Sequence, residues 1–302
     1  MIEIKDTVLQ IIDQCYYDDR MKELATSFID YKEKEGFRFA ELVLFHYDLF
    51  GGKDKEIVKV AAGIELLILA IDIFDDLVDQ DNPNPPWTSV SPATVTHVAI
   101  GLLIASQKAI DECHLNQDVK QEAKKILNDH SLRCMYGQQK DFENVITTED
   151  DYLRITKEKS GALISSACLL GSIFANKQHV TDVKKYAEYF GIAVQISNDI
   201  NDIQRETKKN DLLHKKKTLP ILFLLQNKDP QFNIIKDYYN GKVTTEIIES
   251  LQQEIITNIK KSGAIEYAKV MMQFEISKAQ KCIDEMDIPT TSKEKIVEFL
   301  LK

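Results

Sequence analysis

The chain has 302 residues, 44% of them hydrophobic, and a formal net charge of −10 at pH 7. A chain of this length can build a sizeable core as one large domain or as two ordinary ones. The acidic balance argues against nucleic acid as a general partner. The low counts of glycine (11) and proline (7) disfavour a turn-rich β protein.

The sequence favours a cytoplasmic protein without a transmembrane segment. The first residues are charged and lack the apolar core of a signal peptide. The longest apolar stretch, residues 60–71, is interrupted by Glu65 and is too short to span a bilayer. The five cysteines are scattered and form no CxxC pair, so neither a disulfide framework nor a zinc site is indicated.

Helical periodicity runs through most of the chain. An apolar stripe marks residues 8–15, and a helix predicted over residues 37–50 is closed by the glycine pair 51–52. Residues 56–78 are apolar nearly all round, which predicts a central core helix, and the proline-rich stretch 81–87 predicts a loop. Further helices are predicted over residues 94–113, 118–145, 149–175, 184–206, 219–226, 244–262 and 264–286.

No shift in composition divides the chain. The pattern therefore predicts one all-α domain over residues 1–302, a bundle of about ten helices. The sequence contains no GxxxxGK[ST], GxGxxG, GxSxG or HExxH motif, and its six histidines are dispersed. The remaining candidates for chemistry are mainly acidic residues.

Two acidic clusters, far apart in the chain, share the spacing i, i+3, i+4, i+7. They are Asp72, Asp75, Asp76 and Asp79, and then Gln195, Asn198, Asp199 and Asp202. This spacing places the oxygen atoms of each cluster on one face of a helix. Both clusters follow apolar helical stretches, so their carboxylates face the negative end of a helix dipole and repel one another.

A hard cation would relieve this repulsion. Mg²⁺ takes oxygen ligands, keeps some of its waters and binds substrate phosphates. The paired clusters therefore predict a metal–diphosphate site between two helices. The alternative interpretation is a pair of solvated acidic faces, and two matched clusters disfavour it.

Five segments, in this order, resemble the trans-isoprenyl diphosphate synthase superfamily. Residues 75–79 match its DDxxD motif, and residues 195–202 match its second aspartate-rich motif. Residues 137–141 resemble its GQxxD segment, residues 159–164 its KTGxLI segment, and residues 211–220 its DLxxxKxTLP stretch. One DDxxD would be weak evidence, whereas five ordered segments are strong.

The resemblance implies an isoprenoid-synthase-type helical bundle with a central active-site cavity. It implies three Mg²⁺ ions that join the motifs to an allylic diphosphate and stabilise it as it leaves and an allylic carbocation forms. The implied metal ligands are Asp75, Asp79, Asn198 and Asp202, with Asp76 and Asp199 in support. The implied substrate contacts are Lys53, Gln138, Arg154, Lys159, Gln195 and Lys216. The basic segment 208–217 fits a solvated loop or a lid over the substrate equally well.

The departures from the family pattern concern the second substrate. Chain-elongating members hold isopentenyl diphosphate with a GGKRxRP segment, but residues 51–57 here place Asp54 and Glu56 at the arginine positions. The His or Gln expected seven residues before DDxxD is Ile68, and residues 80–87 lack the expected Arg-Arg pair. Only Lys53 remains among the expected anchors. A dianionic acceptor would be repelled, so we expect an acceptor that is not a diphosphate.

This pattern resembles the ComQ-type bacterial isoprenyltransferases. That resemblance implies transfer of a geranyl or farnesyl group to a tryptophan of a precursor peptide, as in maturation of a quorum-sensing competence pheromone. The Gly51–Asp54 and Asn82–Trp87 segments are the candidate peptide contacts, and Trp87 is expected to be a structural anchor or a rim contact. Ala70 and Ile71, before DDxxD, leave room for a farnesyl chain, and Phe74 is a candidate for packing on it. A homodimer is compatible with the resemblance.

Three alternatives remain open. A class I terpene synthase would explain Asn198, Asp199, Asp202 and Glu206 in part, but no arginine follows Arg205 to form that class's C-terminal Arg-Tyr pair. A prenyl diphosphate synthase with an altered isopentenyl diphosphate site is the second alternative. The third is a non-catalytic binding subunit, which the nearly complete metal motifs disfavour.

Overall fold

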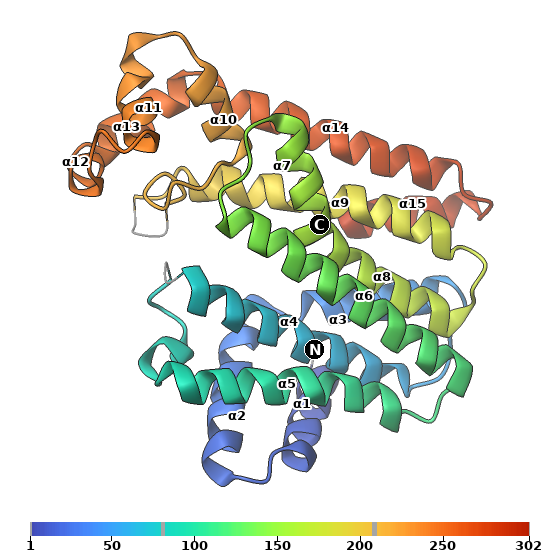
Figure 1. Ribbon diagram of the computed structural model, residues 1–302. Coiled ribbons are helices and arrows are strands. Elements are labelled where there is room, and N and C mark those ends of the chain that lie inside the picture. Colours follow the sequence, from blue (N-terminus) through green and yellow to red (C-terminus); the bar gives the residue numbers. More distant parts are fainter. Residues whose placement is uncertain (1, 80–81, 207–209, 302) are drawn as a thin grey trace. The chain divides into compact units, whose positions relative to one another are not determined.

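The computed structural model describes residues 2–79, 82–206 and 210–301. Within these ranges every regular element is a helix and no strand occurs, which confirms the predicted all-α class (Figure 1). Contacts divide the chain into two compact units. The first unit comprises residues 1–132, 163–187 and 286–302, and the second unit comprises residues 133–162 and 188–285. A single domain with a central active-site cavity stays a prediction.

The first unit is built around α4 (Ile57–Asp79), which packs against α1 (Ile2–Cys15), α2 (Asp19–Glu35), α3 (Arg38–Leu49) and α5 (Pro92–Glu112). Residues 60–71 of α4 are all buried, because this stretch is apolar nearly all round. The predicted central helix is thereby confirmed. The unit also contains η1 (Pro86–Ser89), most of α8 (Ala162–Ala175), α15 (Thr290–Leu300), and the first parts of α6 (Gln117–Phe142) and α9 (Val180–Asp202).

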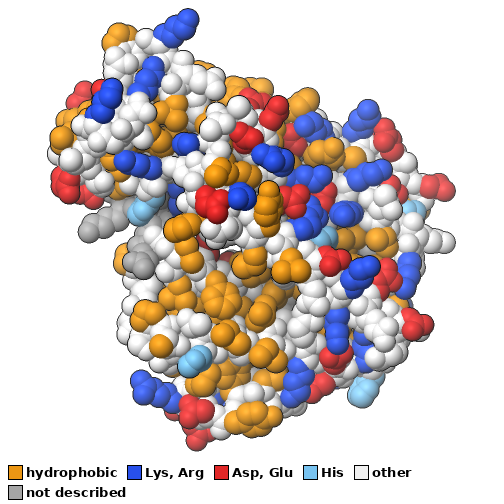
Figure 2. All heavy atoms as spheres, in the orientation of Figure 1, with side chains coloured by type: hydrophobic (Ala, Val, Ile, Leu, Met, Phe, Trp, Pro, Cys, Tyr) orange, Lys and Arg blue, Asp and Glu red, His pale blue; other side chains and the backbone are white. Residues whose placement is uncertain are grey.

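The helix α5 is the one helix in the described part of the chain that is long and apolar enough to cross a membrane by length and composition. It packs along α4 through buried side chains that include Val95, Val98 and Leu102. Its apolar character therefore serves the core of the first unit. Figure 2 shows hydrophobic side chains gathered over α4 and α5 on the face drawn, and α5 exposes Ile100 and Ile104.

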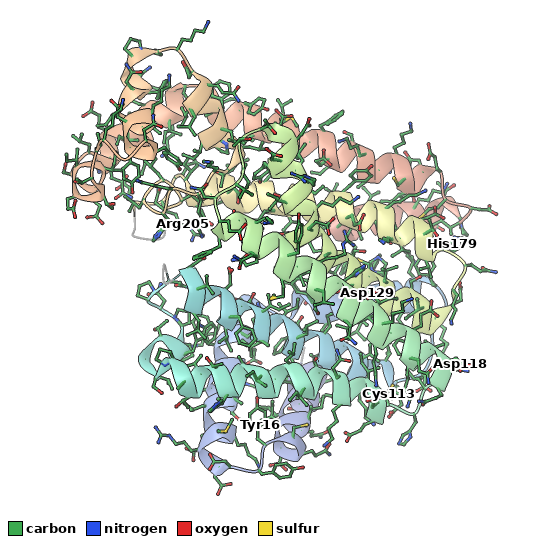
Figure 3. The ribbon with its side chains drawn as sticks, viewed as in Figure 1. Tyr16, Cys113, Asp118, Asp129, His179 and Arg205 are labelled. Atoms are coloured by element: carbon green, nitrogen blue, oxygen red, sulfur yellow. The ribbon has the colours of Figure 1, made fainter. Side chains whose placement is uncertain are left out.

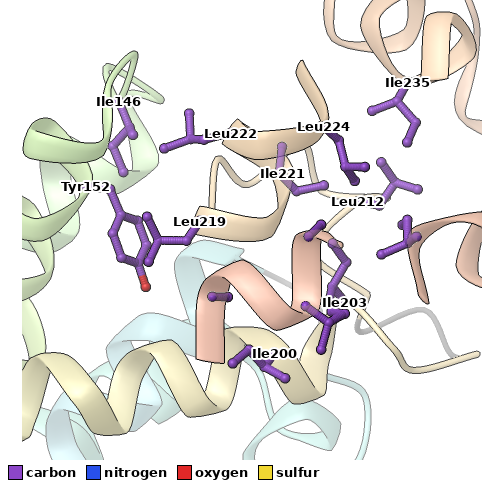
Figure 4. Packing of buried hydrophobic residues seen from close by; sticks show 14 of the residues in the cluster. Ile146, Tyr152, Ile200, Ile203, Leu212, Leu219, Ile221, Leu222, Leu224 and Ile235 are labelled. Atoms are coloured by element: carbon purple, nitrogen blue, oxygen red, sulfur yellow. The ribbon is translucent and has the colours of Figure 1, made fainter. Parts of the chain in front are cut away.

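The second unit contains the last part of α6, the last part of α9 and a series of shorter helices. Its core joins α9, which contributes Ile196 and Ile200, to α10 (Leu219–Gln226) and α14 (Ala264–Asp284) (Figure 4). The apolar residues of α9 recur at helical spacing, which holds one face of this helix against the core. The shorter elements are α7 (Glu149–Thr156), the π-helical turn η2 (Lys157–Gly161), α10 (Leu219–Gln226), η3 (Pro230–Phe232), α11 (Asn233–Tyr239), α12 (Thr245–Ser250), α13 (Gln252–Lys261) and α14 (Ala264–Asp284).

Several predicted helix boundaries were wrong. The helix predicted over 118–145 ends at Phe142, because Asn144 takes the left-handed conformation with φ 54°. The helix predicted over 149–175 is interrupted by η2, and that predicted over 244–262 divides at Leu251. The helix predicted over 184–206 runs from Val180 to Asp202. The helices α2, α11 and α15 were not predicted.

Candidate functional site

The first acidic cluster occupies the last two turns of α4, in the first unit. Its helix is anchored by the buried Ile71 and Ile73, whereas Asp75, Asp76 and Asp79 are half-buried. Asp72, at the start of the cluster, lies 2.7 Å from Nζ of Lys32, a mostly buried lysine of α2. Burial opposes the ammonium charge, but the attraction of Asp72 outweighs it and raises the pKa of Lys32 above its ordinary value. Asp72 is thus held in a structural ion pair.

Trp87 binds the same cluster. Its Nε1 donates to Oδ2 of Asp76 at 2.8 Å, and its side chain is 4% exposed. The indole ring packs edge-on against Phe28 and Tyr31 of α2, with ring centroids 5.4 Å apart in each pair. The prediction that Trp87 is a structural anchor is confirmed.

The segment before α4 is a structured turn. Gly51 has φ 87°, which favours glycine, and Gly52 packs closely on the Tyr47 ring. The Tyr47 hydroxyl accepts from the Asp54 backbone N–H at 2.9 Å, and Oδ1 of Asp54 accepts from the Glu56 N–H at 2.9 Å. The side chain of Lys53 is 80% exposed, with Nζ 3.6 Å from Oδ1 of Asp48.

Glu56 joins this turn to the end of α5. Its Oε2 accepts from Nζ of Lys59 at 2.8 Å and from the backbone N–H of His114 at 3.0 Å. The hydrogen bond from Lys59, together with that from His114, lowers the pKa of Glu56 and keeps it ionised. Both acidic side chains therefore serve to order the backbone.

The second acidic cluster occupies the end of α9, in the second unit. Asp199 is 5% exposed, and its Oδ2 accepts from the Tyr152 hydroxyl of α7 at 2.6 Å. Its Oδ1 accepts from Nε2 of Gln195 at 2.8 Å, and Oε1 of Gln195 accepts from the hydroxyl of Ser160 at 2.6 Å. Asn198 is exposed. The cluster therefore has one deeply held carboxylate beside an exposed amide.

A further carboxyl group, that of Asp211, lies near Asp199 in this region. Burial raises the pKa of Asp199 to about 7. Burial, followed by repulsion from Asp199, raises the pKa of Asp211 well above its ordinary value, while Lys216 opposes the shift. Oδ2 of Asp211 is buried without a hydrogen-bond partner among the described residues. Asp202 pairs with Nη1 of Arg205, which follows α9, at 2.9 Å (Figure 3).

These residues fit a divalent cation in their chemistry. The buried carboxylates repel one another, and Oδ2 of Asp211 is available to a further partner. Across residues 2–79, 82–206 and 210–301, no three His, Cys, Asp or Glu side chains form a complete metal cage. Mg²⁺ commonly binds through one or two carboxylates, waters and substrate phosphates, so it does not need such a cage.

Close backbone packing places Lys159. It lies in η2, a π-helical turn, which is a feature often found at functional sites. A Cβ at Gly137 of α6 would lie 2.7 Å from the backbone nitrogen of Lys159. A Cβ at Gly191 of α9 would lie 2.6 Å from Cα of Gly161. These glycines let α6 and α9 approach η2. Nζ of Lys159 lies 3.0 Å from Oδ2 of Asp141.

The other predicted substrate contacts differ in how exposed their side chains are. Gln138 is half-buried on α6, whereas the side chain of Arg154 is 66% exposed and pairs with Asp151 one turn earlier at 2.9 Å. Ala70 and Ile71 are buried within α4, and Phe74 is half-buried. Their contacts with substrate stay predictions.

The described part of the basic segment, residues 210–217, is an ordered turn. Nδ2 of Asn210 donates to the carbonyl groups of Ile203 and Arg205 at 3.0 and 2.7 Å. Nζ of Lys217 donates to the carbonyl of Asn144 at 3.0 Å. Residues 208–209 of the basic segment, residue 81 of the predicted loop and the preceding residue 80 lie outside the described residues.

The structure adds three polar residues to those predicted, namely Tyr152, Ser160 and Asp211. Ser160 and Asp211 lie inside motif segments, and Asp211 carries a raised pKa. No sequence signal marks Tyr152, because its contact with Asp199 spans 47 positions. The two acidic clusters belong to different units, so a site that joins them stays a prediction.

Comparisons with known proteins agree with the motifs. A model of the family described as polyprenyl synthetase matches residues 22–255. The tryptophan prenyltransferase ComQ of Bacillus subtilis subsp. natto (strain BEST195) is 31% identical over 303 residues, which cover 100% of this chain and 92% of that protein. The tryptophan prenyltransferase ComQ of Bacillus subtilis (strain 168) is 30% identical over 299 residues, which cover 97% of this chain and 96% of that protein.

A solved structure shows the same fold. Geranylgeranyl pyrophosphate synthetase from Pyrococcus horikoshii Ot3 matches with a TM-score of 0.81 and 22% identity, over 99% of this chain and 95% of that chain. The resemblance inferred from the motifs is confirmed. The chain therefore belongs to the polyprenyl synthetase family of prenyltransferases.

Proposed function

We propose that this protein transfers a geranyl or farnesyl group from an allylic diphosphate to a tryptophan of a pheromone precursor peptide, in a Mg²⁺-dependent reaction in the cytoplasm. One observation carries the proposal. By the family resemblance Asp54 and Glu56 stand where chain-elongating relatives bind a second diphosphate, and here both side chains are built into the turn before α4. The two similar proteins described as tryptophan prenyltransferases support an indole acceptor.

The two acidic clusters are the proposed donor site. Asp75 and Asp79 would bind metal from the first cluster, and Asn198 and Asp202 from the second. Bound Mg²⁺, three ions by the family resemblance, would supply the charge that stabilises the departing diphosphate. The buried carboxylate of Asp211, with its raised pKa, supports this role for the region.

Two lysines are the proposed direct contacts to the diphosphate. Asp141 holds Nζ of Lys159 at 3.0 Å, which limits the positions that this ammonium can take. Lys216 is close enough to Asp211 to lower the pKa of that carboxyl group. Each lysine would therefore bind the diphosphate while it lies next to a carboxylate. Positive and negative side chains together suit a complex of phosphate with metal ions.

The acceptor chemistry follows from a neutral indole. The allylic C–O bond breaks, with its electrons leaving on the diphosphate, and C3 of indole forms the new bond to the allylic carbon. The positive charge then moves into the indole ring and is discharged by loss of the N–H proton. Indole needs no diphosphate clamp, and proximity to the allylic carbon supplies much of the rate.

Asp54 and Glu56 also suggest which peptides bind. Asp54 is exposed beside the exposed Lys53, and Glu56 is ionised. The Gly51–Asp54 segment would therefore favour basic residues near the acceptor tryptophan. The described residues of the Asn82–Trp87 segment are the second proposed contact, on the other end of α4.

Mass spectrometry of precursor peptides tests the function. The protein is incubated with Mg²⁺, a tryptophan-containing peptide with flanking lysines, and either geranyl or farnesyl diphosphate. We expect an added prenyl mass with one of the donors and none when the peptide tryptophan is replaced by alanine. An equal mass gain on the alanine peptide would exclude the indole, and a cyclised hydrocarbon formed without peptide would indicate a terpene synthase.

A further inference from the structure

The two acidic motifs share a feature that their sequences do not reveal. In segments 75–79 and 198–202 the second residue, Asp76 or Asp199, accepts a hydrogen bond from a buried aromatic side chain on another element. Trp87 donates to Asp76 at 2.8 Å, and Tyr152 donates to Asp199 at 2.6 Å. The two donors are 4% and 3% exposed. Each contact lies wholly within one compact unit.

In the first motif the donor is itself held by α2. The rings of Phe28 and Tyr31 pack edge-on against Trp87. The neighbouring Lys32 binds Asp72, which lies one helical turn before Asp76. The helix α2 therefore binds two successive turns of the motif helix, directly through Lys32 and indirectly through Trp87.

In the second motif the donor is held by α7. Thr148 and Asp151 form a capping box at the start of that helix, which fixes its first turn next to Tyr152. Both oxygens of Asp199 are engaged, one by Tyr152 and the other by Gln195. A hydrogen-bonded carboxylate of this kind is oriented and has fewer lone pairs left to bind a metal.

We infer that Trp87 and Tyr152 are positioning residues that hold Asp76 and Asp199, the second residues of segments 75–79 and 198–202, so that the first and fifth residues of each segment meet the metal–diphosphate. The inference rests on the metal site of the proposed function. It assigns Asp76 and Asp199 as supports of the motif helices, and Asp75, Asp79, Asn198 and Asp202 as the ligands. Replacing a group that supports a metal ligand commonly lowers the affinity for the metal by roughly 10–100-fold.

The first experiment removes the hydrogen bonds and keeps an aromatic ring at each position. Isothermal titration calorimetry measures Mg²⁺ binding in the presence of inorganic pyrophosphate for wild type, Trp87→Phe and Tyr152→Phe. We expect the half-saturating Mg²⁺ concentration to rise roughly tenfold in each variant. The matched control is Tyr16→Phe, which removes the buried hydrogen bond from Tyr16 to the carbonyl of Val98 at 2.7 Å (Figure 3). It should lower thermal stability and leave Mg²⁺ binding unchanged.

The second experiment does not depend on the aromatic variants remaining folded. Asp76→Asn and Asp199→Asn keep an oxygen that accepts the hydrogen bond, so their Mg²⁺ binding should stay within about threefold of wild type. Asp75→Asn and Asp202→Asn remove ligand charge and should weaken binding by more than roughly tenfold. The reverse order would make Asp76 and Asp199 the ligands and overturn the inference.

The outcomes separate this inference from the proposed function. If wild type binds no Mg²⁺ with pyrophosphate, the proposed metal site fails and the inference fails with it. If wild type binds and both aromatic variants bind equally well, the inference alone fails. A rise in half-saturating Mg²⁺ in those variants, with Tyr16→Phe unchanged, supports it.

Discussion

Glu65 is a buried carboxyl group in the middle of the most apolar helix of the chain. Its Oε1 accepts from the backbone N–H of Ala40 at 2.7 Å, in the first turn of α3. That helix has no side-chain cap of its own, because Phe37 occupies the N-cap position. Burial raises the pKa of Glu65 to about 7. Glu65 therefore caps a neighbouring helix at the cost of placing a carboxylate in the core.

Replacing Glu65 by glutamine should change how stability depends on pH. The pKa of Glu65 is raised in the folded state from 4.5 to about 7, so its contribution to stability is present below pH 4.5 and is lost as pH rises through 7. We expect this one group to lower the unfolding free energy of wild type by on the order of 3 kcal/mol over this pH interval. Glu65→Gln keeps the oxygen for Ala40 and should remove that dependence. Urea unfolding at pH 5 and pH 8 measures the change in unfolding free energy of each protein. An equal change in wild type and in Glu65→Gln would contradict the assignment.

The metal ligands are tested most directly by removing one from each motif. Asp75→Ala and Asp202→Ala should each reduce prenyl transfer by at least roughly 100-fold at saturating donor, because each removes a ligand charge. Their thermal unfolding without Mg²⁺ should remain cooperative. The matched control is Asp129→Ala, which removes an exposed carboxylate from α6 (Figure 3). Turnover at the wild-type rate in either motif variant would exclude the proposed site.

Residue spacing predicted part of this site. The i, i+3, i+4, i+7 pattern is local, so it placed Asp75, Asp76 and Asp79 together on the end of one helix. The partners of these residues are set by contacts distant in sequence. Trp87, which packs against α2, meets Asp76 across 11 positions, and Tyr152 meets Asp199 across 47 positions. Such contacts cannot be read from periodicity.

At the scale of elements, the π-helical turn η2 depends on two close backbone approaches. Gly137 of α6 and Gly191 of α9 both face it without a side chain. The same turn carries Lys159 and Ser160, the second of which donates to Gln195. The position of a proposed diphosphate contact is therefore determined by how closely three helices can approach.

A methyl group at Gly191 should separate these elements. In Gly191→Ala the new Cβ would lie 2.6 Å from Cα of Gly161 and 3.0 Å from the carbonyl oxygen of Ser160. We expect a loss of about 1–3 kcal/mol in unfolding free energy, and a weaker affinity for pyrophosphate with Mg²⁺. Denaturant unfolding and calorimetry measure the two effects.

The matched control for this variant is Gly171→Ala. This change lies in the first unit, where it overpacks α8 against the backbone of Val43 of the same unit. It should lose stability and keep its affinity for pyrophosphate. Equal affinity in the two glycine variants would show that η2 does not depend on the approach of α9.

Helix prediction succeeded where the apolar pattern was strong. The central helix α4 and the short α10 were found because their apolar residues are dense, and α10 matched at both ends. The helix α2 is highly charged and buries only Ala25, Phe28 and Ile29, so its sequence gives a weak signal. The break at Leu251 and the turn at η2 arise from packing, which periodicity does not record.

At the scale of the whole molecule, the protein should be a poor chain-elongating enzyme. Supplied with isopentenyl and farnesyl diphosphates, it should yield little or no longer prenyl diphosphate, because Asp54 and Glu56 would repel a second dianion. Chromatography of the dephosphorylated products measures elongation against transfer to peptide. Elongation at a rate comparable to peptide transfer would mean that the acceptor segment has been misinterpreted.

The burial of Trp87 has a consequence for an enzyme that attacks indole. The chain contains one tryptophan, and its ring is 4% exposed, flanked by two aromatic rings and bound through its N–H to a carboxylate. A ring so enclosed cannot meet a reactive allylic cation. If the proposed reaction is correct, the catalyst therefore contains no accessible copy of its own target and is protected from modifying itself.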